Sequence, residues 1–286
     1  MKQLLFLLTI LTNTLLMAQS PTIDQKWKQI DKEIENGQFK SIQPKIDEIK
    51  TLSRKGNDQQ SIIKALFYEA KIKVATTDET DDVNFVFDNF KKEIDGKSIT
   101  TDAIINSYLA QLYQIYYDEN RYKINSRTNV ENQTSNDVRF WTEETFKKII
   151  NDYFSKSIAE KTDLINAKSS DFRKILTFAD DTKTTQQQLD LSPTLYDVLV
   201  TEYISFLNQN DEKTKGNQLR TDLISIHQQK NNENAVLYNE LILLDEKRND
   251  ILSSDFIKQK EILATKYPKA WYSAYVYAAL ATDLYN

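Results

Sequence analysis

Apolar side chains recur at helical spacing along almost the whole chain after residue 20, and no stretch shows the sustained alternation that predicts a strand. The strongest repeat lies between residues 102 and 117, where apolar and aromatic side chains follow one another every three or four positions. Weaker or shorter repeats predict further helices over residues 27–36, 39–55, 57–75, 82–94, 142–158, 192–208, 219–228, 234–247, 254–266 and 270–285. The pattern therefore predicts an all-α fold.

Residues typical of helix ends support these boundaries. Gly37 is suited to the position just after a helix, where a left-handed backbone is common. Asn57 is expected to cap the following helix, and Thr142 to cap the one that begins with Glu143 and Glu144. The pair at residues 192–193, Ser-Pro, fits an N-cap followed by the first helical position.

Two polar stretches interrupt the helical pattern. Residues 124–137 are rich in Asn, Ser and Thr, and residues 180–190 are rich in Gln with little periodicity. Both are expected to be loops. We expect the region 124–140 to separate two sub-blocks of the helical chain.

Short turns between helices of similar length predict stacked antiparallel pairs. Residues 34–42 resemble the junction between the two helices of a tetratricopeptide repeat, and residues 267–270 resemble the passage from one repeat to the next. In the helix that follows, Ala274, Ala278 and Ala281 would allow a neighbour to approach closely. Because no fixed period connects these segments, we predict a degenerate tetratricopeptide-like helical-hairpin solenoid, whose groove would be a protein-binding surface.

The N-terminus has the layout of a secretory signal peptide. One lysine precedes an apolar run from Leu4 to Leu16, and the small residue Ala18 comes before polar residues. The alternative, a transmembrane anchor, is disfavoured because the run falls short of the roughly 20 apolar residues that span a bilayer. We predict a signal peptide at 1–18 and an exported chain 19–286 in the periplasm or outside the cell, without stable membrane insertion and, lacking cysteine, without N-terminal lipidation.

Composition removes most catalytic chemistry. The chain has no cysteine and one histidine, which excludes disulfides, thiolate metal sites and cysteine nucleophiles. It carries 37 basic and 42 acidic residues, and the basic ones are scattered, so no nucleic-acid surface is expected. We predict no enzyme activity, no catalytic or metal-binding residue and no cofactor.

The residues that could bear chemistry have simpler interpretations. His227 lies near the end of a weakly predicted helix and is expected to be a partly exposed structural histidine. The acidic pairs at 81–82 and 180–181 lie outside any calcium-loop pattern and are expected to be solvated. The pair at 143–144 is explained by charge at a helix start, and the sequon at 132–134 is expected to be a chance match.

Tyrosines gather in two helices. They could line a peptide-binding or sugar-binding groove, although aromatic residues at helical spacing more often pack between helices. The two groups are Tyr108, Tyr113, Tyr116 and Tyr117, and Tyr272, Tyr275 and Tyr277.

Three segments carry a resemblance to a known family. Residues 120–128 (Asn-Arg-Tyr-Lys through Arg-Thr), 141–158 and 192–197 (Ser-Pro-Thr-Leu-Tyr-Asp) are similar to successive pieces of the N-terminal helical region in very large bacterial alpha-2-macroglobulin family proteins of the Bacteroidetes. Residues 27–39 and the helix after Tyr267-Pro268 occur in the expected order, so the resemblance covers nearly all of residues 24–286.

This resemblance implies an exported helical scaffold or interaction module at the N-terminus of a protease-inhibitor protein that continues beyond residue 286. The family's thioester is made from a cysteine and a glutamine, so that chemistry cannot lie in a chain without cysteine. Expected partners are the remaining macroglobulin domains, proteases or envelope proteins. Two alternatives remain open: a stand-alone tetratricopeptide-like envelope adaptor that binds a protein or peptide, and a helical glycan-binding protein.

Overall fold

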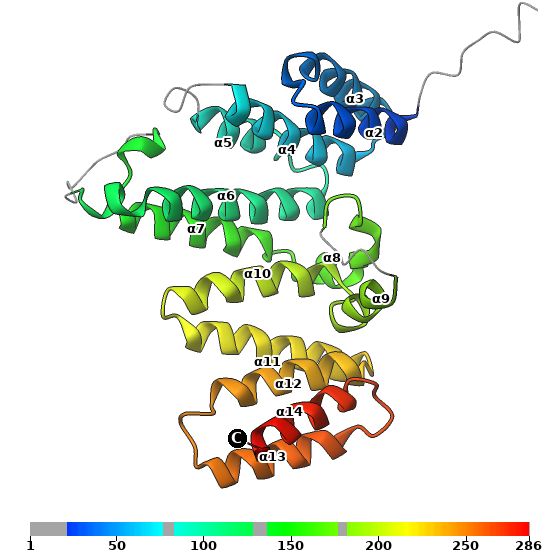
Figure 1. Cartoon of the computed structure of the whole chain (residues 1–286), viewed down its shortest axis with the longest axis vertical. Coiled ribbons are helices and arrows are strands. Elements are labelled where there is room, and N and C mark those ends of the chain that lie inside the picture. Colours follow the sequence, from blue (N-terminus) through cyan, green and yellow to red (C-terminus); the bar gives the residue numbers. More distant parts are fainter. Residues whose placement is uncertain (1–21, 77–82, 128–135, 177–181, 286) are drawn as a thin grey trace, which may run out of the picture. The chain divides into compact units, whose positions relative to one another are not determined.

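The protein is helical throughout the part that its structure, a computed structural model, describes: residues 22–76, 83–127, 136–176 and 182–285 (Figure 1). These residues form thirteen α-helices and three short 3-10 helices, and the described ranges contain no strand, only an isolated bridge between Lys168 and Thr194. The all-α prediction is confirmed. The predicted signal peptide at 1–18 lies outside the described residues.

The chain divides into two compact units, residues 1–82 and 83–286. The described part of the first unit contains α2 (Ile23–Glu35), the 3-10 helix η1 (Phe39–Ser41), α3 (Gln43–Gly56) and α4 (Gln59–Thr76). Helix α3 packs against both α2 and α4. Their shared core consists of Trp27, Ile30, Ile42, Ile46, Ile49, Ala65 and Ile72.

Helix ends in this unit test the predicted signals. Gly37 has a φ of 71°, the left-handed conformation expected after α2. The capping role expected for Asn57 is wrong, because this residue has a φ of 54° and ends α3. The next residue, Asp58, caps α4 instead, since its carboxylate accepts a hydrogen bond from the backbone N–H of Ser61 at 3.1 Å.

The second unit begins with α5 (Val83–Lys92), α6 (Ile99–Asn125), the 3-10 helix η2 (Val138–Phe140) and α7 (Glu143–Ser157). Helices α6 and α7 pack along each other within this unit. Thr142 caps α7 as expected, accepting from the N–H of Thr145. The loop expected from residue 124 starts two residues later, because α6 continues to Asn125; residues 126–127 and 136–137 lie outside helices, and residues 128–135 are not among those described. The separation of two sub-blocks near 124–140 stays a prediction.

Three short elements follow that the sequence pattern did not predict: α8 (Lys161–Asn166), the 3-10 helix η3 (Ser169–Phe172) and α9 (Thr182–Leu191). The loop expected at 180–190 is therefore wrong from residue 182 onward. Glutamine is a good helix former, and α9 contacts α12, with Leu189 buried among the α9 side chains that the structure describes. Because apolar residues do not recur at helical spacing in this segment, the sequence pattern does not predict the helix.

Five helices then stack one after another to the C-terminus (Figure 1): α10 (Leu195–Gln209), α11 (Lys213–Gln229), α12 (Glu233–Glu246), α13 (Ser253–Lys266) and α14 (Ser273–Tyr285). Each packs against the next, and α14 also contacts α12. The start expected at residues 192–193 is wrong by two positions, because Thr194 is the N-cap of α10.

Candidate functional site: two buried polar clusters and an uncovered helix face

Several residues considered from the sequence lie outside the described residues or are explained by their own helix. The acidic pairs at 81–82 and 180–181 and the sequon at 132–134 lie outside the described residues. Glu143 forms an i,i+4 ion pair with Lys147 at 2.7 Å, and the hydrogen bond from this lysine lowers the pKa of Glu143. Glu143 therefore has a structural role within its own helix, as one partner of an i,i+4 ion pair.

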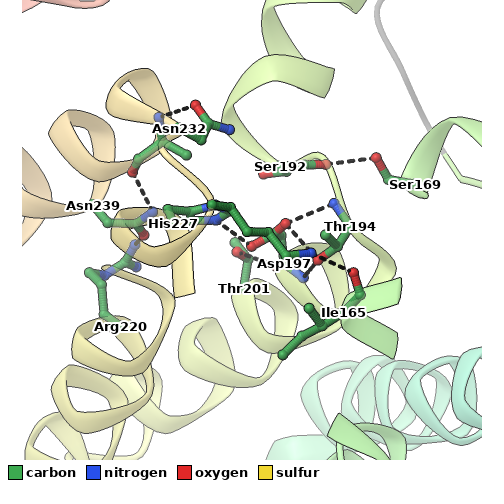
Figure 2. Close-up of polar contacts among 12 residues, drawn as sticks. Ile165, Ser169, Ser192, Thr194, Asp197, Thr201, Arg220, His227, Asn232 and Asn239 are labelled. Carbon is green, nitrogen blue, oxygen red and sulfur yellow. Dashed lines mark hydrogen bonds and ion pairs between the residues drawn. The ribbon is translucent and has the colours of Figure 1, made fainter. Parts of the chain in front are cut away.

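His227 is fully buried, not partly exposed as predicted, and it pairs with Asp197 of α10. Its Nε2 lies 2.8 Å from Asp197 Oδ1 (Figure 2). The other carboxylate oxygen, Oδ2, accepts from the backbone N–H and the hydroxyl of Thr194 at 2.8 and 2.7 Å. This carboxylate is therefore shared between the cap of α10 and a side chain from the last turn of α11.

The surrounding polar groups tie three helices together (Figure 2). The carbonyl oxygen of His227 accepts from the N–H of Asn232, the residue that caps α12. Buried Arg220 of α11 donates to Asn239 of α12 at 3.1 Å. Each polar group is placed by a helix end or by a neighbouring helix, so the arrangement fixes the stacking of α10, α11 and α12.

This network has the character of a structural anchor. A histidine and a carboxylate can perform general acid–base catalysis when a third group that reacts lies within hydrogen-bond reach. His227 and Asp197 are 0% and 2% exposed, and the hydroxyl nearest to the carboxylate, that of Thr194, already donates to it. The fold supplies the partners of His227 Nε2 and of both Asp197 carboxylate oxygens, whereas the buried Nδ1 of His227 has no hydrogen-bond partner.

A buried ion pair fixes the C-terminal helix. Lys260 of α13 is 2% exposed and lies 2.6 Å from Asp283 of α14 and 2.7 Å from Asp245 of α12. Arg248 also reaches Asp283 at 2.7 Å. A lysine is almost never buried without such partners. Asp283 is the only charged residue of α14, and its charge is turned inward.

The start of α14 is held as firmly as its end. The indole N–H of Trp271 donates to Asp190 of α9 at 3.1 Å, and the backbone N–H of Tyr272 donates to Asn234 of α12 at 3.0 Å. The ring of Tyr272 stacks on that of Tyr275 with a centroid distance of 5.3 Å. Burial raises the pKa of Tyr272 to about 12. Helix α14 is thus fixed to the rest of its unit at both ends.

The two groups of tyrosines have different surroundings. Tyr113, Tyr116 and Tyr117 of α6 pack into an aromatic cluster with α5 and α7, in which Tyr113 stacks on Phe87 at 4.0 Å and on Tyr153 at 5.7 Å. Burial strongly raises the pKa of Tyr113. By contrast, Tyr275 and Tyr277 of α14 are 51% and 50% exposed. Only the second group is accessible to a partner.

These tyrosines belong to a continuous uncovered surface. Helix α14 buries Ser273, Val276 and Leu280, which face α12 and α13. On the opposite side lie eight exposed residues, none of them charged, which we call the α14 outer face: Ala274, Tyr275, Tyr277, Ala278, Ala281, Thr282, Leu284 and Tyr285.

Comparisons with protein-family models, with curated proteins and with solved structures yield no match. Among the described residues, no group of three or more His, Cys, Asp or Glu side chains is placed to hold a metal ion. None of the described helices has the length and apolar character needed to cross a membrane. The α14 outer face therefore stands as the candidate functional surface on its geometry alone.

Proposed function

We propose that this chain is a helical scaffold that assembles with another protein through the α14 outer face. The observation that carries the proposal is a helix held at both ends by polar contacts and exposing eight uncharged residues on one side. A fixed apolar surface rimmed by polar residues is typical of a protein-interaction site. The expected occupant is an α-helical segment that lies along α14.

The other helices of the stack show what such a sequence normally contacts. Helix α12, like α14, carries apolar residues around its whole circumference, although it also contains four acidic residues, and it is covered by α9, α11, α13 and α14. A helix at the end of a helical stack usually has a polar outer side. Because α14 lacks one, its sequence is that of an internal helix, and a further helix is expected to cover it.

The packing of α14 also supports a finer description. It contacts both α13 and α12, as the first helix of a tetratricopeptide repeat contacts the two helices of the repeat before it. The turn before it contains Tyr267-Pro268, the segment that resembles a passage between repeats. We therefore propose that residues 195–285 form degenerate tetratricopeptide-like hairpins.

From the resemblance to alpha-2-macroglobulin family proteins, we also propose that this scaffold belongs to an exported inhibitor whose signal peptide is removed near Ala18. An antibody raised against residues 20–286 tests this on fractionated source cells. A band several times larger than the 33.4 kDa of this chain supports the inhibitor, and protease-trapping assays on the whole protein follow. A band at or just below that mass contradicts it and favours the stand-alone envelope adaptor.

The glycan-binding alternative gains no support from the aromatic cluster around α6. Tyr113, Tyr116 and Tyr117 of α6 contact other rings, and Tyr113 and Tyr117 are buried. A sugar needs the open face of a ring to stack on it. We do not propose this function.

Photo-crosslinking in source cells tests the docking surface. The photoreactive residue p-benzoylphenylalanine replaces Tyr277 in one variant and Tyr122 of α6, which is 92% exposed, in a matched control. We expect a discrete protein adduct from position 277 and none from position 122. Absence of an adduct at 277, or equal adducts at both positions, contradicts the proposed function.

A further inference from the structure

The α14 outer face has the spacing of a coiled-coil seam. Ala274, Ala278, Ala281 and Tyr285 are separated by four, three and four residues, which is the alternation of d and a positions in a heptad repeat. On the same numbering, the flanking e and g positions are occupied by Tyr275, Tyr277, Thr282 and Leu284. The buried residues of α14 fall at the remaining positions.

The flanking positions decide the kind of neighbour. In an ordinary two-helix coiled coil the e and g residues are often charged, because they border water and form ion pairs. Here all four are uncharged, and three of them are 50–60% exposed: Tyr275, Tyr277 and Leu284. The partner must therefore bring an uncharged helix face of similar width.

The face is complementary in size to itself when two copies lie antiparallel. Antiparallel helices place a positions opposite d positions. Ala274 then lies opposite the partner's Tyr285, and Ala278 opposite the partner's Ala281. Among the flanking residues, Tyr275 lies opposite the partner's Thr282. Tyr285 and Tyr275 thus each meet a smaller residue, Tyr277 lies beside the partner's Leu284, and the central alanines allow the helix axes to approach to about 8 Å.

A parallel arrangement lacks this fit. It would place Ala274 opposite the partner's Ala274 and Tyr285 opposite the partner's Tyr285, which leaves a gap at one end and crowds the other.

Charge also permits the antiparallel pair. The chain carries a net charge of −5, yet the only charged residue of α14, Asp283, is paired internally with Lys260 and Arg248, so no like charges meet at the contact.

We propose that the occupant of the α14 outer face is a second copy of this chain, which binds through its own α14 in antiparallel orientation around a two-fold axis. This inference rests on the proposed function and names the partner. The two 13-residue helices would bury about 1,000 Å² of accessible surface in total, which is at the low end for specific interfaces. We therefore expect a two-fold symmetric dimer with a dissociation constant of about 10 μM.

Sedimentation velocity of the purified chain from about 1 to 200 μM tests association. We expect the mass to rise from 33.4 kDa toward twice that value. Ala278→Arg, at the centre of the seam, is expected to remain monomeric over the whole range. Ala159→Arg changes an exposed alanine outside α14 and is expected to dimerise like the unchanged chain.

Engineered cysteines test the orientation, because the chain has none of its own. Ala274→Cys and Tyr285→Cys chains, mixed and oxidised, are expected to form the mixed disulfide between positions 274 and 285. In the antiparallel pair, two copies of position 274 are separated by about 16 Å along the helices, beyond the roughly 7 Å reach of a disulfide. Ala274→Cys alone should therefore not cross-link.

Three results would overturn this proposal: a monomer at all concentrations, a dimer that Ala278→Arg leaves intact, or a 274–274 disulfide formed in preference to the mixed one. If the chain is monomeric while position 277 still cross-links to a different protein in cells, the proposed function stands and the second copy is the wrong partner. If neither association occurs, both fail.

Discussion

Helices α10 and α14 are built alike and yet are covered very differently. Each is rich in tyrosine and aliphatic residues, and each has a buried aspartate paired with a cation or histidine from the next or previous helix. The tyrosines of α10, Tyr196 and Tyr203, are 2% and 1% exposed. Those of α14, including Tyr275 and Tyr277, are half exposed or more.

The difference lies in the neighbours. Helix α10 is contacted by α6, α7, α8 and α11, whereas α14 is contacted by α12 and α13 on one side. The same kind of sequence thus produces a core helix in one place and an apolar surface in the other. The comparison teaches that apolar composition predicts a need for burial but does not name the surface that satisfies it.

The largest expected effect on stability comes from replacing one tyrosine by alanine in α10 and comparing it with the same replacement in α14. Tyr203→Ala removes a ring that stacks on Phe154 and a hydroxyl that donates to Asn151 at 2.7 Å. We expect it to lower the free energy of unfolding by about 4 kcal/mol. Tyr277→Ala should change it by less than about 0.5 kcal/mol, because half of that side chain is already in water. Urea denaturation followed by circular dichroism measures both. Similar losses for the two variants would show that α14 is packed as α10 is.

The ion pair beneath α14 gives the next largest effect. Lys260→Ala leaves the buried carboxylate of Asp283 with Arg248 alone, and we expect a loss of about 3 kcal/mol in the free energy of unfolding. The double variant Lys260→Met and Asp283→Leu should recover most of this loss, since no charge then remains buried.

A surface pair provides the control. Lys161 and Asp222 are 42% and 54% exposed in their side chains, so Lys161→Ala should cost less than about 0.5 kcal/mol in urea denaturation. An equally small loss for Lys260→Ala would mean that Asp283 does not hold α14 in place.

The cap of α10 is expected to have a smaller effect. Thr194→Ala removes the hydroxyl that accepts from the N–H of Asp197 and donates to its carboxylate. We expect a loss of about 1–2 kcal/mol, measured by thermal or urea unfolding. Thr221→Ala, at an exposed site on α11, should lie within about 0.5 kcal/mol of the unchanged chain.

The smallest effect depends on pH. Burial, with smaller contributions from Asp222 and Asp197, raises the pKa of Tyr196 from 10.0 to about 12. The stability that this tyrosine contributes is therefore complete below pH 10 and is lost as the pH rises toward 12. Relative to the unchanged chain, Tyr196→Phe should gain about 1 kcal/mol in unfolding free energy between pH 8 and pH 11. Identical pH profiles for the two proteins would contradict the burial of this hydroxyl.

The parts of the fold that the sequence predicts are those with a repeated pattern or a specific end signal. The long helices, the left-handed Gly37 and the cap Thr142 were all visible in this way. Helices α8 and α9 were not, because apolar residues do not recur at helical spacing in either segment, although Leu164 and Leu189 are buried. The caps at residues 57 and 192 were misplaced because neighbouring residues, Asp58 and Thr194, can cap equally well.

The candidate site, too, could be predicted from the sequence only in part. The small residues at 274, 278 and 281 already indicated a close neighbour from the sequence, and they now lie on the α14 outer face. The pairing of His227 with Asp197 could not be predicted, since 30 residues separate the two and only the stacking of α10 on α11 brings them together. Burial of Lys260 beside Asp283 depends on tertiary packing for the same reason.

Hydroxyl-radical footprinting of the protein in source cells tests the central claim most directly, namely that the α14 outer face is covered in the working assembly. Oxidation of Tyr277 is compared with that of Tyr122 by mass spectrometry, in cells and in the dilute purified chain. The account predicts that Tyr277 is protected in cells and reactive after dilution, while Tyr122 reacts equally in both. Equal reactivity of Tyr277 in both samples would contradict it.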